Sequence, residues 1–199
     1  MARKASYDRD EVLQNALELF WAKGYHATSL KDLEVALDMR PGSIYAAFGS
    51  KEALFAETLK RYAERSQAQF DRTVAGAPTP LAGLAAHVRA LGCPPEGKAP
   101  PSRACMLVKT LLETPDDDAE LRRLTEDRMR EIEAGFAGAF RAARDAGQIA
   151  ADSDPERLAR RLQAAVFGLR AYAQRSDAGA RTVELAEDIA RDLEALAVR

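Results

Sequence analysis

The chain has 199 residues, 47% of them hydrophobic and 30% charged, a composition typical of a folded globular protein and not of a disordered chain. No stretch approaches the roughly 20 apolar residues of a membrane helix, and the N-terminus lacks the apolar core of a signal peptide, so we expect a cytoplasmic protein without a membrane partner. The net charge is −2, and residues 1–51 hold seven cations and seven acids, so composition gives no support for nucleic-acid binding.

Prolines divide the chain into segments, and between them apolar residues recur at intervals of three and four. Proline is excluded from helix interiors, and this spacing predicts amphipathic helices. No run alternates like a half-buried strand, so we predict an all-α fold of nine helices without a sheet. The expected helices cover residues 9–23, 30–37, 41–48, 51–74, 81–91, 105–113, 119–146, 155–176 and 180–197.

Local signals mark the ends of the first three helices. Asp8, with Glu11 three residues later, has the pattern of a capping box at the start of the first helix. Thr28 and Ser29 are good caps for the second helix. Pro41 occupies the first-turn position that proline favours in the third. Residues 28–55 therefore predict two short helices joined by a tight turn after a longer helix, which is the helix-turn-helix arrangement.

The residues of this segment make the prediction more specific, because they resemble the TetR/AcrR family of bacterial regulators over about residues 7–62. The resemblance implies a helix-turn-helix DNA-binding domain over residues 1–50 and a helical ligand-binding and dimerisation domain over residues 51–199. The residues that match the family pattern in order are Phe20, Gly24, Tyr25, Gly42, Ser43, Ile44, Tyr45, Phe48, Ser50, Lys51, Glu52 and Leu54.

The resemblance also implies which residues contact DNA. A helix N-terminus can hold a phosphate, and Arg40 is the best candidate for a bidentate guanine contact. Arg3 and Lys4 would form a basic arm that reaches the minor groove or the backbone. The expected DNA-binding residues are Thr28, Ser29, Lys31, Arg40, Pro41, Gly42, Ser43, Tyr45 and Lys51.

Each DNA-binding assignment has a plainer alternative. In isolation, Tyr45 would be a half-buried core aromatic and Lys51 a solvated lysine at a helix start. Arg40 and Lys31 would be ordinary surface cations. The recognition helix is also poor in polar readers, since alanines stand at residues 46–47 where many relatives have polar side chains, so the operator sequence cannot be predicted.

The second domain of relatives contains an apolar cavity among its middle helices. Cys105 follows Arg103 near a predicted helix N-terminus, and both features favour a thiolate; some relatives carry a sensing cysteine in a similar segment. The alternative is a small buried hydrophobe, and Cys93 is a weaker candidate for a partner thiol. The residues expected to meet a small apolar ligand, oxidant or electrophile are Cys105, Leu107, Thr110, Leu111, Phe136, Phe140 and Phe167.

The last two helices carry apolar stripes at helical spacing. In relatives these helices pack against their symmetry mates in a homodimer, and two-fold pairing is the usual symmetry. The alternative is that both stripes are buried within one chain. The expected interface residues are Leu158, Leu162, Val166, Leu169, Leu185, Ile189 and Leu193.

These patterns predict a transcriptional repressor that binds a palindromic operator in double-stranded DNA and is released by a small molecule or by thiol modification. The alternative is a DNA-binding protein that acts mainly through a protein partner, without a small-molecule effector. An enzyme is disfavoured because the two histidines, His26 and His87, lie in different segments, and no metal-ligand spacing, triad or phosphate-binding glycine loop occurs. We expect no cofactor, metal or catalytic residue.

Overall fold

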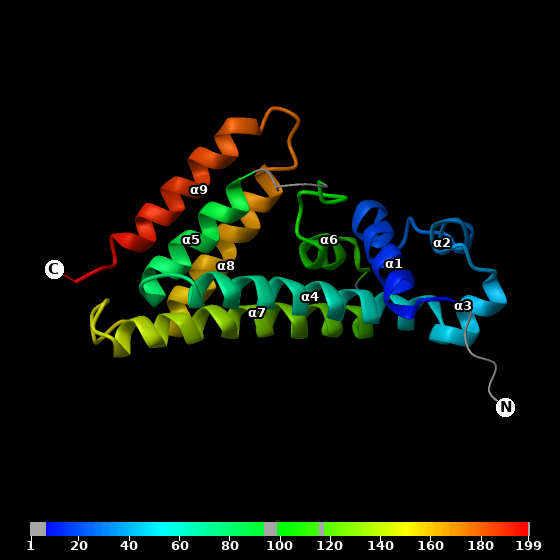
Figure 1. The fold of residues 1–199 in the computed structure, drawn as a ribbon, viewed down its shortest axis with the longest axis horizontal. Coiled ribbons are helices and arrows are strands. Elements are labelled where there is room, and N and C mark those ends of the chain that lie inside the picture. Colours follow the sequence, from blue (N-terminus) through cyan, green and yellow to red (C-terminus); the bar gives the residue numbers. More distant parts are fainter. Residues whose placement is uncertain (1–6, 94–98, 116–117, 199) are drawn as a thin grey trace.

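The computed structural model describes residues 7–93, 99–115 and 118–198, which form nine helices (Figure 1). The expected basic arm of Arg3 and Lys4 lies outside these residues. Within them, β structure is limited to an isolated bridge between Ile149 and Ala197, which confirms the all-α prediction. The helices are α1 (Arg9–Lys23), α2 (Leu30–Leu37), α3 (Pro41–Phe48), α4 (Lys51–Ala75), α5 (Pro80–Gly92), α6 (Met106–Glu113), α7 (Ala119–Asp145), α8 (Pro155–Tyr172) and α9 (Gly179–Glu194).

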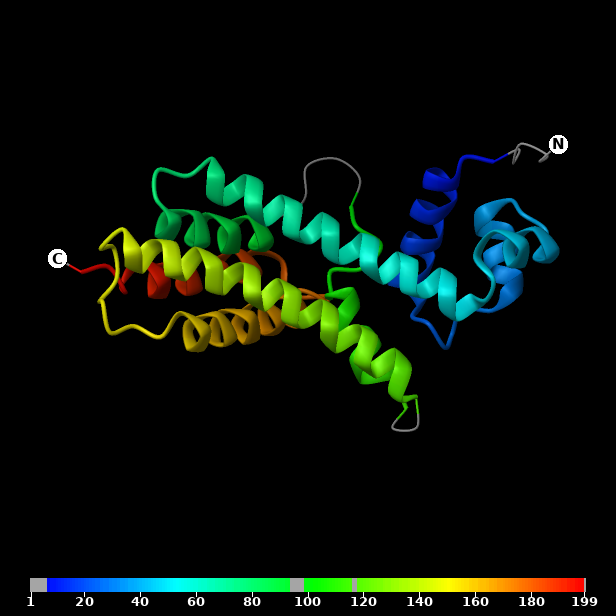
Figure 2. The ribbon, with the colours of Figure 1, turned by 90° about the horizontal axis from the view of Figure 1, so that it is seen from below.

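The molecule is elongated, with α1, α2 and α3 gathered at one end and α5, α8 and α9 toward the other (Figure 1). The long helices α4 and α7 run side by side along its length and connect the two ends, as both views show (Figure 2). The short helix α6 packs against both long helices, α4 and α7. None of the helices that the structure describes is both long and apolar enough to cross a lipid bilayer.

Side-chain caps explain where several helices begin. The Asp8 carboxylate accepts a hydrogen bond from the Asp10 amide at 2.9 Å and caps α1, but the predicted capping box with Glu11 does not form. The capping box lies instead at α2, where Ser29 accepts from the Asp32 amide and the Asp32 carboxylate accepts from the Ser29 amide. The short Asp32 side chain satisfies the same backbone donors that a glutamate usually serves.

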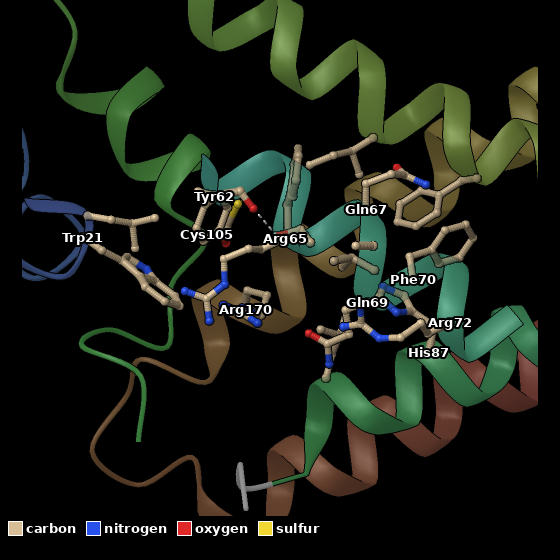
Figure 3. Close-up of a pocket in the computed structure, with 18 residues that line it drawn as sticks. Trp21, Tyr62, Arg65, Gln67, Gln69, Phe70, Arg72, His87, Cys105 and Arg170 are labelled. Carbon is tan, nitrogen blue, oxygen red and sulfur yellow. Dashed lines mark hydrogen bonds between the residues drawn. The ribbon is translucent and has the colours of Figure 1, made fainter. Parts of the chain in front are cut away.

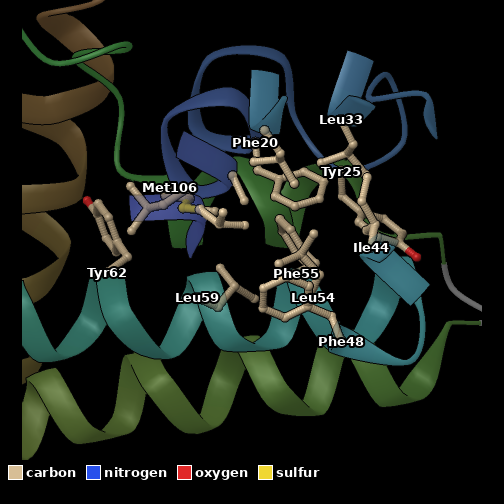
Figure 4. Close-up of a cluster of buried hydrophobic side chains, with 14 of the residues drawn as sticks. Phe20, Tyr25, Leu33, Ile44, Phe48, Leu54, Phe55, Leu59, Tyr62 and Met106 are labelled. Carbon is tan, nitrogen blue, oxygen red and sulfur yellow. The ribbon is translucent and has the colours of Figure 1, made fainter. Parts of the chain in front are cut away.

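The apolar side chains form two hydrophobic clusters. The first joins α1, α2 and α3 to the first half of α4 and to α6, and Figure 4 shows Phe20, Leu33 and Ile44 converging on Phe55 and Leu59. This cluster crosses the boundary expected at residue 50. The second cluster joins the end of α4 to α5, α7, α8 and α9. The helix-turn-helix thus shares one core with α4 and α6, so its position depends on both.

The backbones of α5 and α9 approach each other closely at Gly92. A Cβ atom added at Gly92 would lie 2.3 Å from the Ala186 Cβ atom of α9, closer than real Cβ atoms come. On the polar side of the same helix pair, Arg89 forms ion pairs with Glu187 at 2.7 Å and with Glu194. Glycine at residue 92 is therefore required by the α5–α9 contact.

Candidate DNA-binding surface and effector cavity

The recognition helix α3 presents one face to solvent and buries the other. Ile44 and Phe48 point into the first cluster, whereas Tyr45, one residue after Ile44, is 45% exposed. Arg40 is the N-cap residue, and Pro41 occupies the first turn as predicted. Tyr45 does not belong to this cluster, so the alternative interpretation as a core aromatic does not hold. The other expected residues of this helix start, Arg40, Gly42 and Ser43, are exposed, and Pro41 is partly exposed.

Contacts from α1 and α4 hold the end of α3 in place. The Arg9 guanidinium donates to the Ala47 carbonyl at 3.0 Å and lies 4.6 Å from the centre of the Phe48 ring. The same group donates to both carboxylate oxygens of Glu57 at 2.8 Å. A planar guanidinium can make these contacts together, so α3 is attached to both longer helices through Arg9.

The start of α2 offers part of the expected phosphate-binding surface. Ser29 and Lys31 are exposed there. Thr28 is a correction: its side chain is fully buried and its hydroxyl donates to the Gly24 carbonyl at 2.6 Å, so it cannot touch DNA directly. Because Gly24 ends α1, the Thr28 hydroxyl instead fixes the turn between α1 and α2.

Lys51, the first residue of α4, is partly exposed and leans on an aromatic ring. Its Nζ atom lies 4.4 Å from the centre of the buried Tyr25 ring, a cation–π contact. Burial lowers the pKa of Lys51, while the nearby Glu52 opposes that shift. Burial, followed by the hydrogen bond to Glu52, raises the pKa of Tyr25. Lys51 therefore stays close to the helix-turn-helix with its charge held at a fixed place.

A cavity of about 300 Å³ lies between α1, α4, α5, α7 and α8, and the segment before α6 also contributes to it (Figure 3). Of the expected ligand residues, Cys105, Phe136 and Phe167 line it. The others do not. Leu107 and Phe140 are fully buried within the two hydrophobic clusters, the Thr110 hydroxyl donates to the Met106 carbonyl within α6, and Leu111 is not among the lining residues.

The cavity wall contains polar groups that the sequence analysis missed. In Figure 3, Trp21, Tyr62, Cys105 and Arg170 lie toward one end, and His87 lies with Phe70 toward the other. Helical spacing contained one usable signal, because Arg170 comes four residues after the buried Val166 and so falls on the inward face of α8. The described lining residues are Leu17, Trp21, Tyr62, Arg65, Ser66, Gln67, Ala68, Gln69, Phe70, Arg72, His87, Leu91, Cys105, Ile132, Phe136, Val166, Phe167 and Arg170.

His87 is a buried polar group in this wall. It is 7% exposed, and its ring meets the Phe70 and Phe136 rings edge-on or tilted, at centroid distances of 5.0 and 5.9 Å. Burial, with a smaller contribution from the Arg170 charge, lowers the pKa of His87 to about 4. The imidazole is therefore neutral near pH 7, and its buried Nδ1 atom has no hydrogen-bond partner.

Cys105 joins the cavity to the helix-turn-helix. It is the N-cap residue of α6, is 8% exposed and lines the cavity. Burial, followed by the adjacent Cys105 thiol, raises the pKa of Tyr62. One residue before Cys105, the Ala104 carbonyl accepts a hydrogen bond from the Trp21 indole at 2.8 Å. The start of α6 is thereby attached to α1. Cys93, the weaker thiol candidate, is exposed.

The apolar stripes of α8 and α9 lie mostly inside one chain. Leu162 and Leu169 are each 3% exposed and Leu193 is also buried, all within the second cluster. These residues, with Val166, therefore belong to the core of the protomer, which corrects the predicted interface. Leu158 and Ile189 are partly buried against the same cluster, and Leu185 is exposed. A stripe at helical spacing marks burial without specifying the partner that provides it.

An exposed recognition helix, a core that it shares with α4 and α6, and a cavity between α1 and the helices of the second half define the class of protein: a helix-turn-helix regulator with an all-helical second domain. Residues 12–58 match the family of bacterial regulatory proteins of the tetR type, and residues 80–187 match the tetracyclin repressor-like C-terminal domain. The chain belongs to the TetR family.

Individual relatives agree with this family. The uncharacterized HTH-type transcriptional regulator YezE of Bacillus subtilis is 32% identical over 81% of this chain and 84% of its own length. The HTH-type transcriptional repressor ComR of Escherichia coli is 44% identical over 69 residues, 35% of this chain and 33% of its own. A cysteine mutant of CifR in complex with 26-bp operator DNA has a TM-score of 0.82 at 30% identity, covering 99% of this chain and 100% of its own.

Proposed function

We propose that this chain is a transcriptional repressor that binds a palindromic operator in double-stranded DNA as a cytoplasmic homodimer, and that leaves the operator when the cavity is filled or Cys105 is modified. The observation that carries the proposal is the position of Tyr45, exposed on a helix whose buried face shares a core with α6. The operator complex of CifR, 30% identical over nearly the whole chain, supports DNA binding by the same fold.

The exposed residues divide into two kinds of contact. Arg40, Gly42 and Ser43 at the start of α3 would face base edges, and the Tyr45 hydroxyl would reach the backbone. Ser29, Lys31 and Lys51 would hold phosphates on either side of the groove. Arg40 makes no side-chain cap to its own helix, so its guanidinium is available for guanine.

Dimerisation would use the outer face of α8 and α9. With Leu162 and Leu169 buried in the protomer, the second half of α8 exposes small residues, Ala164, Gly168 and Ala171, after the exposed arginines of its first half. Leu185 on α9 is the predicted interface residue that remains exposed. Two-fold pairing through these helices would place two recognition helices on one side of the duplex, at a half-site separation of roughly 34–36 Å.

Release of DNA would begin at α6. Filling the cavity, or adding an oxygen or an adduct to the buried Cys105 sulfur, would change the packing around the start of α6. The start of α6 would move, and α1 would follow through the Trp21 hydrogen bond to Ala104. Because α3 is attached to α1 through Arg9, the separation of the two recognition helices would change. The effector acts by binding the DNA-free conformation more tightly.

The proposed function is tested by selecting binding sites from random double-stranded DNA and measuring affinity for the enriched sequence. We expect enrichment of a palindrome, with Arg40→Ala weakening binding at least about tenfold by loss of one bidentate base contact. Arg130→Ala, exposed on α7, is the matched control and should bind normally. Failure to enrich any sequence at low salt would contradict the proposal.

The thiol branch has its own test. After mild treatment with hydrogen peroxide or N-ethylmaleimide, mass spectrometry should find Cys105 modified in the protein that has lost operator affinity. Cys105→Ser should retain affinity after the same treatment, whereas Cys93→Ser should lose it like the original chain. Operator binding that is insensitive to modified Cys105 would leave ligand binding as the release mechanism.

A further inference from the structure

The polar part of the cavity wall is cationic. Three arginines, Arg65 and Arg72 of α4 and Arg170 of α8, line it, and no aspartate or glutamate occurs among the described lining residues. Arg65 is exposed and donates to the Gln14 side chain at 2.8 Å, and Arg72 is exposed on its helix. Arg170 is the cation with the most enclosed position, since its Nε atom is buried and has no hydrogen-bond partner.

A buried guanidinium nitrogen without a partner is costly, because desolvation is not repaid by a hydrogen bond. The second unpartnered group of this wall is His87. Its side chain is buried, at 7% exposure, and its Nδ1 atom has no hydrogen-bond partner. Both groups line one cavity from different helices, α5 and α8. A ligand with a polar head would satisfy the Arg170 guanidinium, and His87 leaves a second unsatisfied hydrogen-bonding group toward the other end of the same cavity.

The remaining wall is apolar and aromatic. Phe70, Phe136 and Phe167 contribute rings from α4, α7 and α8, and Leu91 and Val166 add aliphatic surface. The volume of about 300 Å³ is at the small end of ligand cavities. An occupant therefore needs a compact hydrophobic body, and its polar head must satisfy a guanidinium.

We propose that the effector of this protein is a small aryl- or alkyl-carboxylic acid, bound as the carboxylate with its oxygens on the Arg170 guanidinium and its apolar body extending among Phe70, Phe136 and Phe167 toward the His87 end of the cavity. A carboxylate matches the planar guanidinium in charge and in geometry. The neutral His87, toward the other end of the cavity, adds no second positive charge that would compete with Arg170 for the carboxylate. The proposal rests on the proposed function, because it names the chemical class of the molecule that fills the cavity.

The chain contains its own reporter. It has a single tryptophan, and Trp21 lines the cavity (Figure 3). The probes are the ω-phenylalkanoates from phenylacetate to 6-phenylhexanoate, each paired with its uncharged primary amide, titrated at pH 7.5 while Trp21 fluorescence is recorded. For the best-fitting chain length we expect the carboxylate to bind about tenfold or more tightly than the amide, the ratio typical of one charge-assisted contact.

Two variants separate charge from fold. Arg170→Gln should lose the preference for the carboxylate, while Arg170→Lys should keep part of it, since an ammonium retains the charge but not the planar pair of donors. Arg130→Gln, exposed on α7 and not among the residues that line the cavity, is the matched control and should keep the full ratio. Circular dichroism and operator affinity of each variant report whether it is folded.

The outcomes are distinguishable. Equal affinity for acid and amide, an undiminished ratio in folded Arg170→Gln, or no Trp21 response across the series would overturn the carboxylate proposal, and operator binding would still stand. If a carboxylate binds through Arg170 but does not weaken operator binding, the anion-binding site is supported and the effector role is contradicted. Loss of selective DNA binding in the original chain would contradict the proposed function itself.

Discussion

The Lys109 Nζ atom lies 2.9 Å from the carbonyl oxygen of Trp21, and it also donates to the Ala22 carbonyl at 3.0 Å. These carbonyls belong to the last turn of α1, where helix carbonyls lack partners and a cation is favoured by the helix dipole. Lys109 belongs to α6, one turn after Cys105. The α6 region is therefore joined to α1 at two points, by Lys109 and by the Trp21 indole.

Removing the Lys109 ammonium should weaken this coupling. For Lys109→Met we expect a loss of about 1 kcal/mol of unfolding free energy, the net worth of a typical hydrogen bond. Operator affinity without effector should change little, while the drop in affinity caused by Cys105 modification should shrink. Lys60→Met is the control, since Lys60 only forms a long, exposed ion pair with Glu64. An unchanged response to Cys105 modification would mean that the second contact alone carries the coupling.

Tyr45→Phe should separate DNA affinity from stability. The side chain is exposed, so the unfolding free energy should stay within about 0.5 kcal/mol. Loss of one hydroxyl contact to the DNA backbone should reduce operator affinity up to about tenfold. Because no charge is removed, the salt dependence of binding should be unchanged. Lys31→Ala should instead lower the salt slope by about 1. A stability loss without an affinity loss would return Tyr45 to a core role.

His87 should make the protein less stable in mild acid. Its pKa is about 4 in the folded chain and about 6.5 when unfolded. The unfolded state therefore binds more protons between these values, and the unfolding free energy falls as the pH decreases through that window. Between pH 6.5 and 5 the expected loss is about 1.5 kcal/mol. Urea unfolding at fixed protein concentration should show this loss, and His87→Gln should reduce it; an equal loss in His87→Gln would assign it to other groups.

The contact between α5 and α9 should not tolerate a methyl group at residue 92. For Gly92→Ala we expect a loss of about 1–3 kcal/mol, because the new Cβ atom would overlap with Ala186 and approach the Thr182 carbonyl to 3.1 Å. Gly138→Ala, inside α7 with only the end of Arg141 nearby at 3.9 Å, should stabilise by about 0.5–1 kcal/mol. Thermal unfolding of the pair measures both. Similar shifts for the two variants would argue against close packing at Gly92.

Helix boundaries and the exposed face of α3 could be predicted from the sequence because they depend on neighbouring residues. Pro41 and Ser29 act within one turn of the chain, and the spacing of Ile44 and Phe48 identifies the buried side of α3. The same local information misplaced Thr28, since a residue that can cap a helix can equally bond the preceding turn. Local patterns therefore located the DNA-binding surface, but they did not specify each side chain within it.

The cavity depends on contacts between distant segments. His87 and Arg170 lie on different helices, and periodicity shows that each faces inward without showing that they face the same space. The apolar stripe containing Leu162 raised the same difficulty, since a core and a partner subunit both demand apolar residues. Only the packing of α7 and α5 on α8 decides that Leu162 is internal.

The continuity of α4 limits how the regulator can be re-engineered. Leu54 and Phe55 close the core of the helix-turn-helix, and Tyr62 and Phe70 of the same helix reach the cavity. A chimera that joins the helix-turn-helix of another protein to this chain at residue 50 would pack donor side chains against the α4 side chains of this chain. The shared core would then be built from residues that do not fit one another. A chimera that keeps the core of the helix-turn-helix intact would have to include the first half of α4 from the donor. The new junction would then lie beyond Leu59.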